Sequence, residues 1–257
     1  MQNPMMMTDR VIMVTGGGQG IGRQLAEQLL SLEAKVALVD IDADMLAEAR
    51  DALGASRVST YCGDVSDPEF VNATVDSIVD DQGDLHGLIN NAGIVRAAMA
   101  SEMAIEQWHQ VIGVNLTGAF ICLQAVGRHL ISKAKEGDPN PGSIVNISSD
   151  AGRRGTIGQI NYGAAKSGVL GLTMCSAREW GRYNINVNSV CYGMVETAMT
   201  ETIRQEKFRD KYLSQIPLGR FSTTGDVAPA TCFLLSDAAS YITGQHLSID
   251  GGFYISS

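Results

Sequence analysis

The sequence predicts an α/β fold in which a doubly wound parallel sheet carries helices on both faces. Short apolar runs alternate with amphipathic helical segments along nearly the whole chain of 257 residues, an order typical of parallel sheets with crossover helices. The apolar runs are continuous, as expected for strands buried on both faces. A glycine cluster directly follows the first run, which is where a Rossmann fold places its ligand-binding turn.

In the first half of the chain, each of the leading apolar runs is followed by a helical segment. Apolar residues between Ile21 and Leu32 recur at helical spacing. Asp67 and Pro68 supply an N-cap and a first helical position, so a helix is expected to begin there. We expect strands at 10–15, 35–39, 57–61 and 85–89, and helices at 21–32, 43–53 and 68–79.

The second half continues the alternation without a linker. A Pro/Gly loop is expected at 136–142, between the helical and strand segments around it. Since no composition shift or internal repeat divides the chain, residues 1–257 are predicted to form one domain. We expect helices at 105–113, 114–133 and 162–182, and strands at 143–147, 185–190 and 246–249.

Composition excludes several classes of function. The 28 acidic and 19 basic side chains give a net charge of −9, which opposes binding to nucleic acid or to an anionic membrane. No uncharged apolar run reaches the ~18 residues of a membrane span, and the N-terminus has no signal-peptide pattern. The five cysteines and four histidines are scattered, so we expect reduced thiols, no metal site and a cytoplasmic location.

The glycine-rich turn at 15–22 (TGGGQGIG) is expected to bind a dinucleotide. Glycines let the backbone approach a pyrophosphate, and the following helix offers free N–H groups and a positive dipole end. A tight turn without a ligand is the plain alternative. A nucleoside-triphosphate loop is a poorer match, because Arg23 and Gln24 stand where Lys and Ser/Thr are required.

Asp40 closes the second strand about twenty residues after the glycines. A carboxylate there accepts hydrogen bonds from both adenosine ribose hydroxyls and repels a 2′-phosphate. Neither Gln19 nor Ile41 supplies a cation for that phosphate. The sequence therefore favours NAD over NADP, although Asp40 could instead only cap the next turn.

Tyr162 and Lys166 share one helix face at i,i+4 spacing. An ammonium about 4 Å away could stabilise a phenolate by up to ~4 kcal/mol at an effective dielectric of 20. That would lower the tyrosine pKa by roughly three units, toward the range of an acid/base catalyst. Such a pair is common on helix surfaces, so the rest of the sequence must decide its meaning.

Further motifs lie in order along the chain: Thr15-Gly16-x₃-Gly20-x-Gly22, Asn90-Asn91-Ala92-Gly93, Asn115, the strand at 144–149 and Tyr162-x₃-Lys166. Together they resemble the short-chain dehydrogenase/reductase family over nearly the whole length. The segment 161–166 is most similar to the branch that contains 3-oxoacyl-acyl-carrier-protein reductases.

The resemblance implies a catalytic tetrad. Tyr162 would exchange the proton at the substrate oxygen, and Lys166 would lower its pKa and bind the nicotinamide ribose. Ser149, thirteen residues before the tyrosine, would hydrogen-bond the substrate oxygen, while Ser148 would support the strand end. Asn115 would anchor a water that relays protons.

The resemblance also implies a set of NAD contacts, from the glycine turn to the segment after the sixth strand. One departure is that Tyr192 replaces the usual proline before Gly193, which would loosen or reshape the wall beside the nicotinamide. The expected contacts are Gly16, Gln19, Gly20, Ile21, Gly22, Asp40, Asp64, Val65, Asn91, Ala92, Gly93, Tyr162, Lys166, Val195 and Thr197.

The substrate is expected to lie between the loop after Ser149 and an amphipathic lid at 198–215. Arg153 and Arg154 could bind an anionic substrate, but a solvated surface pair is favoured. Asp40 and the net charge of −9 favour a small-molecule dehydrogenase acting on a polyol, sugar or hydroxy acid. The alternatives are a 3-oxoacyl-acyl-carrier-protein reductase and a non-catalytic NAD-binding regulator. The resemblance further implies a homotetramer.

Overall fold

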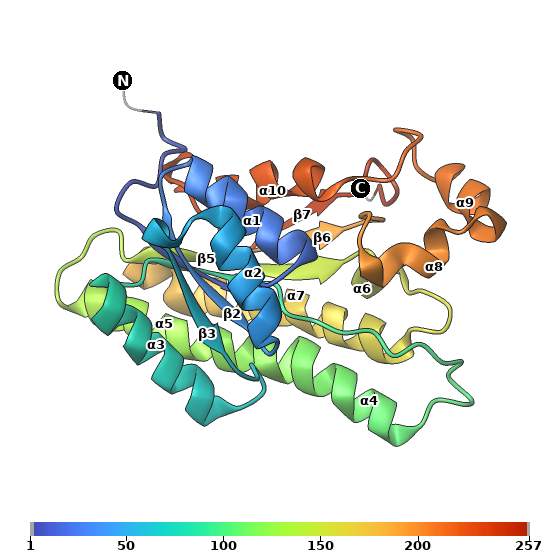
Figure 1. The fold of residues 1–257 in the computed structure, drawn as a ribbon, viewed down its shortest axis with the longest axis horizontal. Helices are drawn as coiled ribbons and strands as arrows, with labels where there is room; N and C mark the ends of the chain where they lie inside the picture. The colour runs from blue at the N-terminus through green and yellow to red at the C-terminus, as the bar shows by residue number, and fades with distance from the viewer. Residues whose placement is uncertain (1–2, 256–257) are drawn as a thin grey trace.

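The computed structural model describes residues 3–255, and within them seven strands form one parallel sheet (Figure 1). The spatial order is β3-β2-β1-β4-β5-β6-β7, which reverses direction between β1 and β4 and confirms the doubly wound sheet. Such a reversal opens a crevice at the carboxyl ends of the strands. The strands are β1 (Val11–Thr15), β2 (Lys35–Asp40), β3 (Val58–Cys62), β4 (Gly87–Asn90), β5 (Gly142–Ser149), β6 (Ile185–Tyr192) and β7 (His246–Ile249).

Helices cover both faces of the sheet (Figure 1). Successive strand residues point to opposite faces, so Ile12 and Val14 pack in one core layer while Val11 and Met13 pack in the other. The first layer is closed by α1 (Gly20–Ser31), α2 (Ala43–Leu53) and α10 (Thr224–Phe233). The second face carries α3 (Pro68–Gln82), α4 (Ile105–Ile112), α5 (Ala119–Lys135) and α7 (Ile160–Trp180).

The two helices expected at 105–113 and 114–133 form one continuous helical stretch. A π-helical turn (Gly113–Gly118) joins α4 to α5 in place of a break. By length and composition alone, Ile105–Lys135 could cross a membrane, and it is the one such stretch among the described residues. In this fold α5 buries Cys122, Val126 and Leu130 against the sheet, as a core helix does.

The segment 198–215, whose amphipathic pattern suggested a lid, is divided into short helical pieces. It forms a 3₁₀ turn (Ala198–Thr200), then α8 (Glu201–Arg204) and α9 (Glu206–Leu213). Gln205 has an extended backbone (φ −60°, ψ 148°), which separates the two helices. Two further helices, α10 and the short α6 (Ala151–Arg154), have no counterpart in the expected set.

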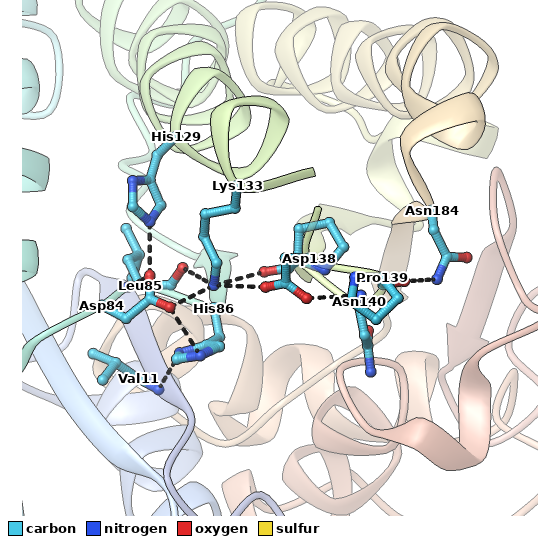
Figure 2. A network of polar contacts seen from close by, with 11 residues as sticks. Val11, Asp84, Leu85, His86, His129, Lys133, Asp138, Pro139, Asn140 and Asn184 are labelled. Carbon is cyan, nitrogen blue, oxygen red and sulfur yellow. Dashed lines mark hydrogen bonds and ion pairs between the residues drawn. The ribbon is translucent and has the colours of Figure 1, made fainter. Parts of the chain in front are cut away.

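A polar network fixes the opposite, amino-terminal edge of the sheet (Figure 2). Asp84 receives the Lys133 ammonium at 2.6 Å, His129 Nε2 at 2.9 Å and His86 Nε2 at 3.2 Å. Lys133 also lies 3.5 Å from Asp138 in the Pro/Gly loop. These contacts tie the end of α5 to the start of β4, far along the strands from the crevice.

Candidate active site

The glycine-rich turn lies between β1 and α1. Gly16 and Gly20 have φ values of 64° and 54°, which glycine adopts without strain. A Cβ on Gly22 would come within 2.0 Å of the Gly16 carbonyl oxygen, so only glycine allows this packing. In the described chain no side chain caps α1 and no acid lies in its first turn. The free N–H groups there fit a pyrophosphate.

Asp40 ends β2 beside this turn. Its Oδ2 accepts the Gly18 N–H at 3.0 Å, and its Oδ1 accepts the Asp42 N–H at 3.2 Å. These bonds hold a half-buried carboxylate against the glycine turn. Its neighbours Gln19 and Ile41 are uncharged, so the geometry fits a ribose diol better than a phosphate.

Asn91 anchors the glycine turn to the end of β4. Its side-chain amide donates to the carbonyls of Thr15 and Gly16 at 3.0 and 3.2 Å. The Thr15 hydroxyl accepts the N–H groups of Asn91 and Ala92 at 2.9 and 3.0 Å. The expected contacts Asn91, Ala92 and Gly93 therefore lie at the same crevice as the turn, with the Asn91 side chain committed to the protein.

The remaining expected cofactor residues come from two loops. Thr197 faces the turn, since its Cγ2 lies 4.0 Å from a Cβ placed on Gly20. Val195 is buried and its carbonyl accepts the Thr200 hydroxyl at 2.6 Å. After β3, Asp64 is exposed and accepts from the N–H and hydroxyl of Ser66, both at 2.8 Å, while Val65 is buried against Gly118.

The two serines at the end of β5 have different partners. Ser148 is buried and donates its hydroxyl to the Lys166 carbonyl at 2.8 Å, which supports the strand end. Ser149 is half-buried, accepts the Ala151 N–H at 3.2 Å and donates its hydroxyl to the Tyr192 carbonyl at 3.5 Å. Ser149 and Tyr162 line the same pocket. Ser149 is thus the serine that faces the tyrosine.

Burial raises the pKa of Tyr162 to about 12, and the neighbouring Ser149 hydroxyl acts in the opposite direction. Lys166 does not lower the pKa of Tyr162 in this structure. This corrects the lowering that the i,i+4 spacing of the two residues predicts. Its Nζ lies 5.8 Å from the tyrosine ring centroid and donates to the Ile147 carbonyl at 2.7 Å. Burial lowers the pKa of Lys166 to about 8.

Asn115 is buried in the π-helical turn that joins α4 to α5. Its side chain is paired with Ile94, accepting the N–H at 2.8 Å and donating to the carbonyl at 2.9 Å. A π turn disrupts the i→i−4 ladder and often marks a functional site.

Asn161 is a positioning residue for which the sequence offered only its place beside Tyr162. It is fully buried, and its amide donates to the carbonyls of Arg96 and Gln107 at 3.0 and 3.1 Å. Its Oδ1 accepts the Tyr162 N–H at 2.7 Å. These bonds attach the first turn of α7 to the segments that contain Arg96 and Gln107. They therefore fix the backbone position of Tyr162.

Tyr192 does not loosen the wall that the usual proline would form. It is 4% exposed and pairs with Ser149 on β5 and Ile249 on β7. Its hydroxyl lies 2.8 Å from that of Thr231. The wall is reshaped by a core tyrosine that is held at both its backbone and its hydroxyl.

A pocket opens between these residues and the C-terminal segment. Its lining includes Ser149, Tyr162 and Phe253. Arg154 also lines it and stacks on Phe253, 3.6 Å from the ring centroid. Arg153 is not a solvated side chain as expected, since it donates to the Ser248 hydroxyl and the His246 carbonyl, both at 2.7 Å.

The described residues contain no group of three or more His, Cys, Asp or Glu side chains arranged to hold a metal ion. The five cysteines are free thiols, of which Cys62 and Cys175 are exposed.

Comparison with known proteins identifies relatives along the whole chain. Residues 16–254 match the family model described as enoyl-(acyl carrier protein) reductase. A 3-oxoacyl-(acyl-carrier-protein) reductase of Thermotoga maritima is 40% identical over 98% of this chain and 100% of its own. The corresponding reductase of Vibrio cholerae is 37% identical, with the same two coverages.

Solved structures show the same fold. A Sinorhizobium meliloti protein assigned to the short-chain alcohol dehydrogenases superposes with a TM-score of 0.91 at 34% identity, covering 98% of both chains. Levodione reductase superposes with a TM-score of 0.89 at 34% identity, covering 95% of this chain and 97% of its own. The similarity to the Thermotoga maritima and Vibrio cholerae reductases favours the alternative expectation, a 3-oxoacyl-acyl-carrier-protein reductase, over the polyol or sugar dehydrogenase.

Proposed function

Because this chain belongs to the short-chain dehydrogenase/reductase family, we propose that it reduces a ketone, or oxidises the matching alcohol, with Tyr162 as acid/base. The observation that carries the proposal is the convergence of Ser149, Tyr162 and Lys166 at the carboxyl end of β5. That place lies beside the glycine turn and opens into a pocket. The remaining tetrad member, Asn115, lies on the π-helical turn of the same crevice.

Each side chain has a distinct task in this proposal. Tyr162 and Ser149 line the same pocket, so one substrate oxygen placed between them can contact both. Nicotinamide adenine dinucleotide, when bound, supplies or accepts the hydride. Tyr162 is protonated near neutral pH and can give its proton to the oxygen of a ketone. Lys166 uses one N–H donor on Ile147, and an ammonium has three, so it can also bind a ribose.

We propose NAD as the cofactor, because the Asp40 carboxylate lies where the adenosine ribose would bind. NAD is expected to bind at least tenfold more tightly than NADP, which corresponds to about 1.4 kcal/mol. Asp40→Asn removes the negative charge and should narrow this ratio. Fluorescence titration of both cofactors measures it, with Asp76→Asn on the exposed face of α3 as control. Equal affinities for the wild type would contradict the role of Asp40.

We propose a 3-oxoacyl thioester as the substrate, reduced at its 3-keto group. Relatives at 37–40% identity over nearly the full length carry that activity in their names. A small ketone is the second candidate. The similarity to levodione reductase supports it, and so does the net charge of −9, which would repel an acidic carrier protein. The free thiols fit a cytoplasmic enzyme.

A turnover screen tests the function. Acetoacetyl-coenzyme A, acetoacetyl-acyl-carrier-protein, cyclic diketones and polyols are each supplied with NADH or NADPH, or with the oxidised forms for alcohols. We expect the thioesters to be reduced fastest, and Tyr162→Phe to lower kcat by about 10²- to 10⁴-fold, the usual contribution of an acid/base group.

Two results would contradict parts of this proposal. Turnover of ketones but not of thioesters would favour the small-molecule enzyme. If neither wild type nor Tyr162→Phe turned over any substrate while NAD still bound tightly, the chain would be a non-catalytic NAD-binding regulator.

A further inference from the structure

Two acidic side chains meet at the wall of the proposed substrate pocket, which Asp150 itself lines. Asp150 directly follows Ser149, and Asp250 directly follows β7. Asp150 is 3% exposed and Asp250 is 8% exposed. A carboxyl group buried this deeply requires a hydrogen-bond donor or a positive charge, since its desolvation is otherwise too costly.

The two carboxyl groups differ in their partners. Asp250 accepts the N–H groups of Gly252 and Tyr254, each at 2.8 Å. Among the described residues, neither oxygen of Asp150 has a hydrogen-bond donor. Gly193 packs against both acids, since a Cβ on it would lie 2.8 Å from the Asp250 Cβ and 3.3 Å from Asp150 Oδ2. No larger residue could stand there without moving the pair.

A shared proton resolves this arrangement. Two neighbouring buried carboxyl groups do not both ionise near neutral pH. Because Asp250 already accepts two backbone hydrogen bonds, a proton shared by the pair would lie on Asp150 and would be directed at Asp250. Burial and the Asp250 charge raise the pKa of Asp150 to about 7, while Arg154 and Arg153 act in the opposite direction. On β6, the buried Cys191 faces the same pair as a neutral thiol, with its pKa raised by burial.

The proton connects the active-site end of β5 to the C-terminal turn at 250–254. That turn carries Phe253, which is buried and lines the pocket. Phe253 in turn supports the Arg154 guanidinium, 3.6 Å above its ring. The position of this wall therefore depends on whether Asp250 is held against Asp150.

We propose that Asp150 is a positioning residue: by donating a proton to Asp250 it holds the turn at 250–254 in place, and so sets the Phe253–Arg154 wall of the substrate pocket. The proposal rests on the proposed function in taking this pocket as the substrate site. When Asp150 ionises, two buried negative charges repel and the turn moves away. Substrate binding then weakens, while the reacting groups on β5 and α7 stay in place.

The test compares pH profiles of the wild type, Asp150→Asn and the control Asp76→Asn. One readout is the hydrogen-exchange protection of the Gly252 and Tyr254 amides, corrected for intrinsic exchange, from pH 6 to 9. The other is KM and kcat for acetoacetyl-coenzyme A with saturating NADH. Lys166 titrates in all three proteins. A difference between the pH profiles of the wild type and Asp150→Asn therefore reports the titration of Asp150.

In the wild type and in Asp76→Asn, we expect protection to fall about tenfold or more across this range. KM should rise at least threefold, with kcat changing less than KM. In Asp150→Asn the side-chain amide donates to Asp250 at every pH, so protection and KM should stay level.

Identical profiles for the wild type and Asp150→Asn would overturn the proposal. If Asp150→Asn does not fold, the hydrogen-exchange protection of the Gly252 and Tyr254 amides in the wild type is the deciding measurement. Protection that does not change with pH in the wild type would also overturn the proposal. An absence of turnover in the wild type, combined with pH-dependent protection that Asp150→Asn abolishes, would refute the proposed function and leave the link between the two acids supported.

Discussion

At the scale of single residues, the site depends on side chains that serve both the core and the pocket. Tyr192 ends β6 in the core, yet its carbonyl accepts the N–H of Asp150, the residue directly after Ser149, at 3.0 Å. Its hydroxyl contacts Thr231 on α10, whose own hydroxyl donates to the Val227 carbonyl at 2.8 Å. Tyr192 therefore couples the position of the serine to a helix on the far side of the core.

Removing this hydroxyl pair should have unequal costs. Thr231 keeps its bond to Val227 in Tyr192→Phe, so we expect a loss of about 1 kcal/mol in the free energy of unfolding. Thr231→Val leaves the tyrosine hydroxyl buried without a partner and should cost more, about 1–3 kcal/mol. The double variant should be no less stable than Thr231→Val. Urea unfolding measures all three, and a larger cost for Tyr192→Phe than for Thr231→Val would contradict the assignment of donor and acceptor.

The sequence predicted the positions of those proposed site residues whose type and spacing form a motif. Asp40, Ser149 and Tyr162 lie where the motifs place them, at the crevice. The contacts of Asn161 and the role proposed for Asp150 could not be recognised, because both depend on burial against segments far away in the chain. The prediction that Lys166 lowers the Tyr162 pKa was wrong for the same reason. The i,i+4 spacing does not show that Lys166 donates to the Ile147 carbonyl.

At the scale of elements, strands and capped helices were predictable and irregular helices were not. The helix at 43–53 and the strand at 246–249 have the predicted bounds, because local signals mark both ends. The features that were missed include the π-helical turn and α10. The π-helical turn leaves no gap in the apolar pattern, and α10 is apolar on several sides with Pro229 inside it. Its stability comes from packing against α1, which no local pattern reveals.

The polar network at the start of β4 should make stability depend on pH (Figure 2). His86 accepts the Val11 N–H at 3.1 Å through Nδ1, so it is held neutral, and burial lowers its pKa to about 4. The unfolded chain takes up this proton near pH 6.5. The contribution of His86 to the free energy of unfolding is therefore fully present above pH 6.5. Below that pH, the free energy of unfolding should fall by up to about 1.4 kcal/mol per pH unit down to pH 4. Asp84, whose pKa is lowered, loses its contribution only below this window.

Denaturant unfolding at several pH values between 4.5 and 7 measures this effect. His86→Gln can still accept and donate without titrating, so its profile should be flatter than that of the wild type. His109→Gln, at an exposed position on α4, serves as the matched control. If His86→Gln shows the same dependence of the free energy of unfolding on pH as the wild type, the acid sensitivity comes from other groups.

At the scale of the whole molecule, the crevice is assembled from the ends of strands that are distant in sequence. Residues from β1, β2, β4 and β5 meet there with the C-terminal turn. The regular alternation of buried strands and helices predicted this arrangement, because parallel strands place their carboxyl ends at one edge. Subunit assembly is a different matter, since it depends on which apolar side chains the finished surface leaves uncovered.

We expect the chain to form a homotetramer through its long helices and its last strand. Phe120 on α5 and Met174 on α7 are 43% and 46% exposed, and β7 is an edge strand that presents Leu247 at 38% exposure. Apolar side chains on such faces are typical of subunit interfaces. Light scattering should give about four times the chain mass of 27.4 kDa.

Substitutions on the two faces should dissect this assembly. Phe120→Asp places a charge on the helical face and Leu247→Lys places one on the edge strand, so each should halve the mass at micromolar concentration. Ile41→Lys changes a side chain that is 69% exposed and follows β2, away from both faces, and should leave the mass unchanged. A wild-type mass of a single chain would contradict the tetramer. If Ile41→Lys alone reduced the mass, the interface would lie on the β2 side of the sheet instead.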